Sequence, residues 1–340
     1  MALSLAGLDF ELLVYIFGVC HVAALASLAR TSKLIKNASD RRRRKLAALK
    51  NIPCNVKKLE FLNLGIDIVT FADAVKQTYD NPVCPLPSLK QLDINVWLQA
   101  PASAFAPIGN AGFVALASAW ISGSLGNLVQ LRLRNNQIGD AGMAAFADAI
   151  TSRSLAKLQE LEFAENKIGD AGMAELSRVS GSLPNLEELS LGYNKIGDAG
   201  MSAFAGAIAR GSLGNLRHLE FGYNQIGDAG MTELSRAIAS GSMANLQMLN
   251  LWNNQIGDAG MIEFSRAIAS GSLGMLDYLY LWMNKIGDAG VSALAGAIAS
   301  GSLESIQFID LDDNQASETG KKQMRDAARA RGLDVQLIDD

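Results

Sequence analysis

The feature that most constrains this chain is a short string that returns at a fixed period. The string NQIGDAGM, at residues 136–143, recurs with few changes through the second half of the sequence. The asparagines that mark successive copies are Asn136, Asn166, Asn194, Asn224, Asn254, Asn284 and Asn314. They lie 30 residues apart, except that 28 residues separate Asn166 from Asn194. A period of this length predicts a stack of similar units rather than one globular core.

One unit contains the signals for a strand followed by a helix. Leu131 and Leu133 alternate with polar residues, which is the pattern of a half-buried strand. Asp140 is placed to cap the helix that follows it, and Phe146 and Ile150 lie on one apolar face of that helix. A Gly-Ser segment then ends the helix. Each unit is therefore predicted to be strand, turn, helix and turn.

Stacking such units predicts a curved array. Parallel strands lie about 4.8 Å apart, whereas packed helices need roughly 10 Å. The stack must bend, with strands on the concave face and helices on the convex face. We expect the repeated Asn to point inward and to bond backbone groups where each strand ends, so that a ladder of buried asparagines follows the array.

The repeats resemble the leucine-rich repeat family, whose pattern is LxxLxLxxNxI. The long helical half with IGDAG is similar to the ribonuclease-inhibitor-like class. The resemblance implies an α/β solenoid over 51–340, with regular repeats over 128–316 and a polar C-terminal cap over 317–340. Residues 51–127 hold degenerate repeats, in which Leu64 and Trp97 occupy the Asn position.

The strand positions that face outward differ between copies, so the scaffold does not dictate them. Aromatic residues gather in the middle and later copies, and carboxylates flank them. The candidate partner-binding residues are Tyr193, Tyr223, Trp252, Tyr278, Tyr280, Trp282, Glu162, Glu220, Asp310 and Asp312. Clustered Trp and Tyr are typical of binding hot spots. We predict a protein or peptide partner with basic residues; the alternative is that the rings stack on one another and stabilise the sheet.

Composition argues against catalysis and metal binding. The net charge is only −4, so the chain as a whole gives no reason to expect nucleic-acid binding. There are three cysteines without a CxxC pair and two histidines, and no nucleotide-binding, metalloprotease or hydrolase motif occurs. We therefore expect no enzyme activity, no cofactor and no metal, and a cytoplasmic or nuclear location with reduced cysteines.

The first fifty residues depart from the repeat. Residues 12–29 contain no Asp, Glu, Lys or Arg, so they are long enough to be a membrane anchor. Residues 8–37 also resemble an F-box, a short helical motif that binds the Skp-type adaptor of cullin ubiquitin ligases. The residues that match it and would bind the adaptor are Leu8, Leu12, Leu13, Ile16, Phe17 and Leu25. In this interpretation residues 1–50 are all α-helical; a plain helical cap on the first repeat is a further alternative.

These patterns together predict a binding protein. The specific form is a substrate-recruiting F-box-like subunit of a cullin-type ubiquitin ligase, whose concave face holds the target. The alternative is a plain leucine-rich repeat binding, inhibitor or scaffold protein, anchored to a membrane or free. A GTPase-activating protein is a third possibility, by analogy of fold alone. We interpret the basic run at 41–50 as a solvated helix face rather than a nucleic-acid site.

Overall fold

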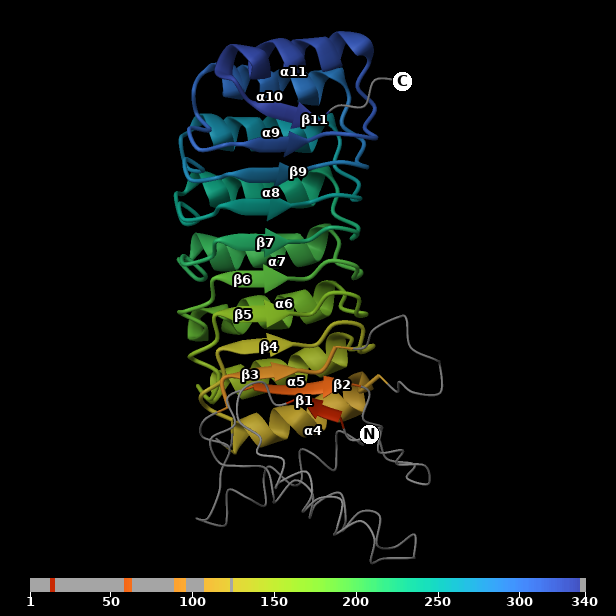
Figure 1. Cartoon of the computed structure of the whole chain (residues 1–340), viewed down its shortest axis with the longest axis vertical. Coiled ribbons are helices and arrows are strands. Elements are labelled where there is room, and N and C mark those ends of the chain that lie inside the picture. Colours follow the sequence, from red (N-terminus) through yellow and green to blue (C-terminus); the bar gives the residue numbers. More distant parts are fainter. Residues whose placement is uncertain (1–12, 16–57, 63–88, 96–106, 123–124, 337–340) are drawn as a thin grey trace, which may run out of the picture.

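The computed structural model describes residues 13–15, 58–62, 89–95, 107–122 and 125–336. These residues form two layers, a sheet of short strands and a row of helices behind it (Figure 1). The strands are β1 (Leu13–Tyr15), β2 (Lys58–Leu62), β3 (Gln91–Asp93), β4 (Gln130–Arg132), β5 (Glu160–Glu162), β6 (Glu188–Ser190), β7 (His218–Glu220), β8 (Met248–Asn250), β9 (Tyr278–Tyr280), β10 (Phe308–Asp310) and β11 (Asp334–Gln336). The helices are α4 (Gly109–Ile121), α5 (Asp140–Thr151), α6 (Asp170–Val179), α7 (Asp198–Ala209), α8 (Asp228–Ala239), α9 (Asp258–Ala269), α10 (Asp288–Ala299) and α11 (Glu318–Arg331).

The strands pair in chain order from β1 to β11 and form one open sheet. All pairs from β2 onward are parallel, and one helix separates each strand from the next between β3 and β11. The register repeats without a slip, so that corresponding residues of each copy lie side by side. The predicted α/β solenoid of alternating strands and helices is confirmed.

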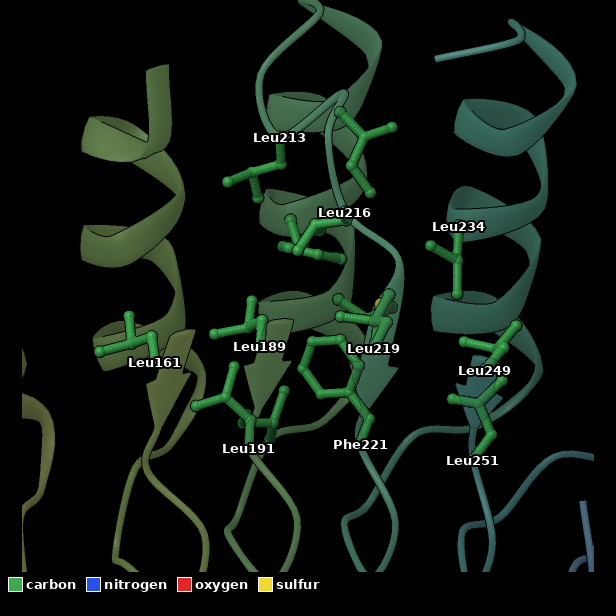
Figure 2. Close-up of a cluster of buried hydrophobic side chains, with 14 of the residues drawn as sticks. Leu161, Leu189, Leu191, Leu213, Leu216, Leu219, Phe221, Leu234, Leu249 and Leu251 are labelled. Atoms are coloured by element: carbon green, nitrogen blue, oxygen red, sulfur yellow. The ribbon is translucent and has the colours of Figure 1, made fainter. Parts of the chain in front are cut away.

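The core lies between the two layers and consists of the apolar residues that recur in every copy. Figure 2 shows two of its rows, Leu161, Leu189, Leu219 and Leu249 at the centres of four strands, and Leu191, Phe221 and Leu251 just after three of them. All of these side chains are buried. Truncating one buried leucine to alanine costs about 2–5 kcal/mol of folding free energy. Because the rows of leucines run from copy to copy, this burial also holds neighbouring copies together.

The predicted asparagine ladder is present. The Asn224 side chain donates hydrogen bonds to the carbonyls of Leu191 and Phe221 (both 3.0 Å) and accepts one from the Ile196 N–H (3.0 Å). The same three bonds recur at Asn166, Asn194, Asn254, Asn284 and Asn314. Each amide therefore satisfies backbone groups of two adjacent copies at the turn, where no strand pairing is available.

The aspartate of the repeated string does not cap its own helix, and that prediction is wrong. Asp198 Oδ1 accepts hydrogen bonds from the N–H groups of Gly227 (2.7 Å) and Gly230 (2.9 Å), which begin the helix of the next copy. Asp198 is the first helical residue and Gly197 is the N-cap, so its carboxylate is one position too late to reach its own first turn. It stabilises the N-terminus of the neighbouring helix instead.

This capping between copies accounts for the second glycine of the repeated GDAG string. A Cβ added to Gly230 would lie 2.7 Å from Asp198 Oδ1, a distance that real Cβ atoms do not show. The carboxylate and the glycine therefore act together to join neighbouring copies. The same pair of bonds recurs from Asp140 to Asp258, and the Asn110 side chain accepts the corresponding bonds at the start of the regular array.

The helices end largely as predicted. Gly211, Gly241, Gly271 and Gly301 follow four of them with φ between +80° and +91°, which is the left-handed geometry that favours glycine. The short copy differs, because α6 has 10 residues and continues into a 3₁₀ turn, Ser180–Ser182. The missing two residues are thus removed from the end of the helix, and the strand and its Asn keep their places.

The prediction of an all-helical N-terminal segment is wrong at the three residues of that segment that the structure describes. Leu13–Tyr15 form β1, which pairs antiparallel with β2 and becomes the first strand of the sheet. Val14 and Tyr15 favour strands, and β2 would otherwise present unpaired backbone groups at the sheet edge. The other predicted adaptor-binding residues, Leu8, Leu12, Ile16, Phe17 and Leu25, lie outside the described residues, as do Leu64 and Trp97 and almost all of the possible membrane anchor.

Candidate protein-binding face

The outer surface of the sheet is the candidate functional site, and we call it the strand face. It consists of the first and third residues of each strand from β4 to β10 and the second and third residues after each strand. The middle residue of each of these strands is buried, so the flanking residues point away from the helices. The scaffold requires a particular residue type at few of these outward positions, and the residues found there differ from copy to copy.

The strand face is strongly acidic. Its cationic side chains are Arg132 and Arg134, and its carboxylates are Glu160, Glu162, Glu165, Glu188, Glu220, Asp310, Asp312 and Asp313. Eight negative charges against two positive charges give this surface a net charge of −6, whereas the whole chain carries −4. The charge of the protein is thus concentrated on one side of the sheet.

Four of the predicted aromatic residues form a continuous cluster, which we call the aromatic shelf: Tyr193, Tyr223, Trp252 and Trp282. The rings of Trp252 and Trp282 stack with centroids 4.4 Å apart and planes 4° from parallel. Tyr193 and Tyr223 stack at 4.6 Å, and both meet Trp252 edge-on at 5.3 and 5.7 Å. The two stacked spacings match the distance between neighbouring strands, about 4.8 Å.

The shelf is held in place by its surroundings. Trp252 lies over Gly222 of the preceding copy, where a Cβ would come within 2.0 Å of its indole nitrogen. Gly222 is therefore the residue that lets the indole lie against the sheet. Tyr193 and Tyr223 have φ of +55° and +56°, a left-handed conformation that is uncommon for bulky residues. Asn or Gly would adopt it more easily, so the choice of tyrosine favours a role beyond the fold.

The shelf remains accessible although its rings stack. Tyr193 is 39% exposed and Tyr223 is 49% exposed, and Trp252 and Trp282 are half-buried rather than buried. The rings therefore pack on one another, as the alternative interpretation of the sequence predicts, and part of their surface stays accessible. Stacking covers one face of each ring, so cation–π contacts are available only on the faces that remain open.

An acidic depression lies beside the shelf, over β5, β6 and β7. Its polar lining comes from Arg134, Glu160, Glu162, Glu188, Ser190, His218 and Glu220, with Met248 at its edge. Both arginines are already paired: Arg132 forms a bidentate ion pair with Glu160, which is part of this lining, and Arg134 pairs with Glu165. The centre of the depression is therefore left with carboxylates that these ion pairs do not neutralise.

Glu162 is a partly buried carboxylate of this depression. Its side chain is 20% exposed, and its nearest cationic atom, Arg132 Nε, lies 3.9 Å away. Burial raises the pKa of the Glu162 carboxyl above its ordinary value, more than the charges of Arg134 and Arg132 lower it. Glu220 accepts a hydrogen bond from the Ser190 hydroxyl (3.0 Å), and Glu188 Oε1 lies 3.4 Å from His218 Nδ1.

The remaining predicted residues lie toward the C-terminal end of the strand face and do not join the shelf. Tyr278 is exposed, and Tyr280 packs against Phe308 at 5.7 Å. Asp310 accepts the backbone N–H of Asp312 (3.1 Å). Burial raises the pKa of the Asp310 carboxyl, and the charge of Asp312 adds to that effect.

Sequence reasoning missed two kinds of residue at this site. Gly222 and the half-buried arginine pairs shape the shelf and the depression, but neither is recognisable from one copy alone. A signal did exist for the glycines: the position held by Trp252 and Trp282 is Gly192 and Gly222 in the two copies before them. Where one copy has a large residue and the preceding copy has glycine at the same position, the large side chain is predicted to lie over the glycine.

Within the parts of the chain that the structure describes, no group of three or more His, Cys, Asp or Glu side chains is arranged to hold a metal ion. The same parts contain no helix of the length and apolar character needed to cross a bilayer.

Comparisons with known proteins agree with the repeat. Six segments match the leucine-rich repeat family: 127–147, 154–177, 182–205, 215–235, 242–265 and 275–295. No curated protein sequence matches the chain. Among solved structures, it is similar to a leucine-rich repeat protein of Leptospira interrogans, with 19% identity over 78% of this chain and 62% of that one and a TM-score of 0.42.

Two further solved structures are similar. One is the Arabidopsis receptor kinase HAESA in complex with the peptide hormone IDA and a co-receptor, with 14% identity over 86% of this chain and 46% of that one and a TM-score of 0.41. The other is an internalin of Listeria monocytogenes, with 18% identity over 94% and 96% and a TM-score of 0.35. The chain thus spans less than two thirds of the first two proteins. With the family match and the ladder of asparagines together, the repeat array of this chain is a leucine-rich repeat solenoid.

Proposed function

We propose that this chain is a non-enzymatic interaction module that binds a positively charged segment of a protein or peptide on its strand face. The observation that carries the proposal is the combination of a preformed aromatic shelf with a net charge of −6 on the same surface. Aromatic side chains supply much of the energy of protein interfaces. Charge complementarity selects the partner and accelerates encounter.

The rigidity of the surface supports this function. The Asn ladder and the Asp caps fix each copy to the next, and the sheet register does not slip. Little conformational entropy is lost when a partner binds a surface that is already ordered. A partner that binds along the strand face would meet the same arrangement of side chains on one repeat whether or not it also contacts the other repeats.

The experiment compares two peptides and two triple variants of the full chain. The probes are fluorescein-labelled nona-arginine and nona-glutamate, followed by fluorescence anisotropy at low and high salt. One variant removes three strand-face carboxylates, Glu162→Gln/Glu188→Gln/Glu220→Gln. The matched variant removes three from the helices: Glu175→Gln, Glu233→Gln and Glu263→Gln.

We expect nona-arginine to bind, nona-glutamate not to bind, and the affinity for nona-arginine to fall as salt rises. The strand-face variant should lose at least tenfold in affinity, while the helix variant stays within about twofold. Both variants change the net charge equally, so an equal loss in both would contradict a site on the strand face. Absence of nona-arginine binding would contradict the function itself.

The sequence carries a second candidate function, recruitment to a ubiquitin ligase. The F-box-like residues around Leu8 to Leu25 would bind a Skp-type adaptor while the strand face holds a target. The strand at Leu13–Tyr15 is an observation against a helix at that point. Co-purification of the adaptor with the full chain and with residues 51–340 tests it: binding by the full chain alone supports recruitment, and binding by neither removes it.

The location and the class of repeat belong to the same proposal. A recruiting subunit of this kind would act in the cytoplasm or nucleus, and its long helical repeats would place it in the ribonuclease-inhibitor-like class. If the adaptor does not bind, the interaction module remains as a plain leucine-rich repeat binding protein.

A further inference from the structure

We infer that the strand face recognises an extended segment with two features at a fixed spacing: a basic residue for the acidic depression and an apolar residue for the aromatic shelf, three or four positions away. This inference rests on the proposed function and adds the geometry of the partner. The segment runs along the array, across the strands. The spacing between the basic residue and the apolar residue is the same whichever of the two comes first in the segment.

The depression suits one long cationic side chain. The Glu162 carboxylate accepts no hydrogen bond from the residues that the structure describes, and its closest cationic atom, Arg132 Nε, is 3.9 Å away. Glu220 is bonded to the Ser190 hydroxyl, which leaves its carboxylate charge in place. A guanidinium or ammonium group would therefore meet charges that the chain's own ion pairs do not neutralise, and bidentate contacts would favour arginine.

The shelf suits an apolar side chain rather than a second cation. The Trp252 and Trp282 rings cover one another, so much of what they present is ring edge and the remaining open faces. Met283, which is 40% exposed, extends this apolar surface next to Trp282. The two arginines of the strand face lie at the other end, Arg132 on β4 and Arg134 just after it, and no carboxylate lies in the third position of β8 or β9.

The spacing follows from the sheet register. Ser190, Glu220, Asn250 and Tyr280 are paired neighbours on β6, β7, β8 and β9. Neighbouring strands lie about 4.8 Å apart, so the centre of the depression on β6 is roughly 10–14 Å, measured across the strands, from the shelf residues that follow β8 and β9. An extended chain advances about 3.3 Å per residue. Three or four positions therefore bridge the two subsites.

The test uses a series of 12-residue peptides of identical composition. Each contains two adjacent arginines, one phenylalanine, and otherwise glycine and serine. The number of residues between the nearer arginine and the phenylalanine runs from zero to seven, in both orders. Each peptide displaces labelled nona-arginine from the full chain, and the concentration for half displacement is measured.

We expect half displacement at the lowest concentration with two or three intervening residues in at least one order. Peptides with zero or seven should need about fivefold more. The variant Trp252→Ala/Trp282→Ala should remove this dependence while nona-arginine still binds through the depression. A flat series with bound nona-arginine overturns the inference and leaves the proposed function standing; unbound nona-arginine overturns both.

Discussion

Two glycines of one helix give a sharp test of how the copies are joined. Gly290 and Gly296 both lie in α10, and neither has a positive φ. A Cβ at Gly290 would lie 2.8 Å from Asp258 Oδ1, 2.8 Å from Ile286 Cγ2 and 3.0 Å from Met261 Cβ. A Cβ at Gly296 would meet nothing within 4 Å. The same substitution should therefore have opposite effects at the two positions.

The magnitudes follow from general energetics. Alanine is better than glycine inside a helix by about 0.5–1 kcal/mol, so Gly296→Ala should stabilise by that amount. Gly290→Ala gains the same propensity, but overpacking costs about 1–3 kcal/mol. Moving the Asp258 carboxylate also weakens its bonds to the N–H groups of Gly287 (2.8 Å) and Gly290 (2.7 Å). We expect a net destabilisation of about 1–3 kcal/mol.

Urea unfolding of the two variants and the parent, followed by circular dichroism, measures the difference. The comparison controls for helix propensity, because both variants change glycine to alanine in α10. If Gly290→Ala stabilised the protein as much as Gly296→Ala, the account of the carboxylate and glycine as one joining device would be wrong.

Three further predictions concern the ladders and the depression. Asp228→Ala should destabilise the protein by about 2 kcal/mol, because the N–H groups of Gly257 and Gly260 lose a charged acceptor. Asp228→Asn should cost less than half as much, and equal losses of unfolding free energy in urea for the two variants would contradict this. Asn224→Ala should cost about 3 kcal/mol, since it leaves buried backbone groups unpaired on two copies, and an unchanged thermal midpoint would refute it. The affinity for nona-arginine should fall as pH is lowered, and this fall should begin above the pH at which an ordinary glutamate is protonated, because burial raises the pKa of Glu162. Glu162→Gln should shift this fall to lower pH, and an anisotropy titration that showed no shift would exclude Glu162 as the cause.

The sequence predicted those features of the fold that depend on residues within one copy. The strand leucines, the Asn positions and the glycine after each helix could be assigned because each depends on local periodicity or backbone geometry. Asp140 was assigned to the wrong helix for a physical reason. A local pattern shows only that a carboxylate stands at the start of a helix, and the donors it serves belong to the next copy, 29 and 32 residues later.

The candidate site was predictable in its composition but not in its arrangement. Comparison of copies identified Trp252 and Trp282 as outward residues, and the structure places them there. The contact of Trp252 with Gly222, and the ion pairs that occupy Arg132 and Arg134, depend on side-chain conformations across neighbouring strands. The β1 strand was missed because its pairing partner, β2, lies more than forty residues away in sequence.

The central claim is that the aromatic shelf is a binding surface. Trp252→Ala/Trp282→Ala in the full chain should weaken binding of the 12-residue peptide with the optimal spacing by over tenfold, about 1.4 kcal/mol or more, with an unchanged far-ultraviolet circular dichroism spectrum. The matched variant Val114→Ala/Ile121→Ala removes two exposed apolar side chains from α4 and should have no effect on affinity. Equal affinity of the tryptophan variant and the parent, measured by isothermal titration, would contradict the account.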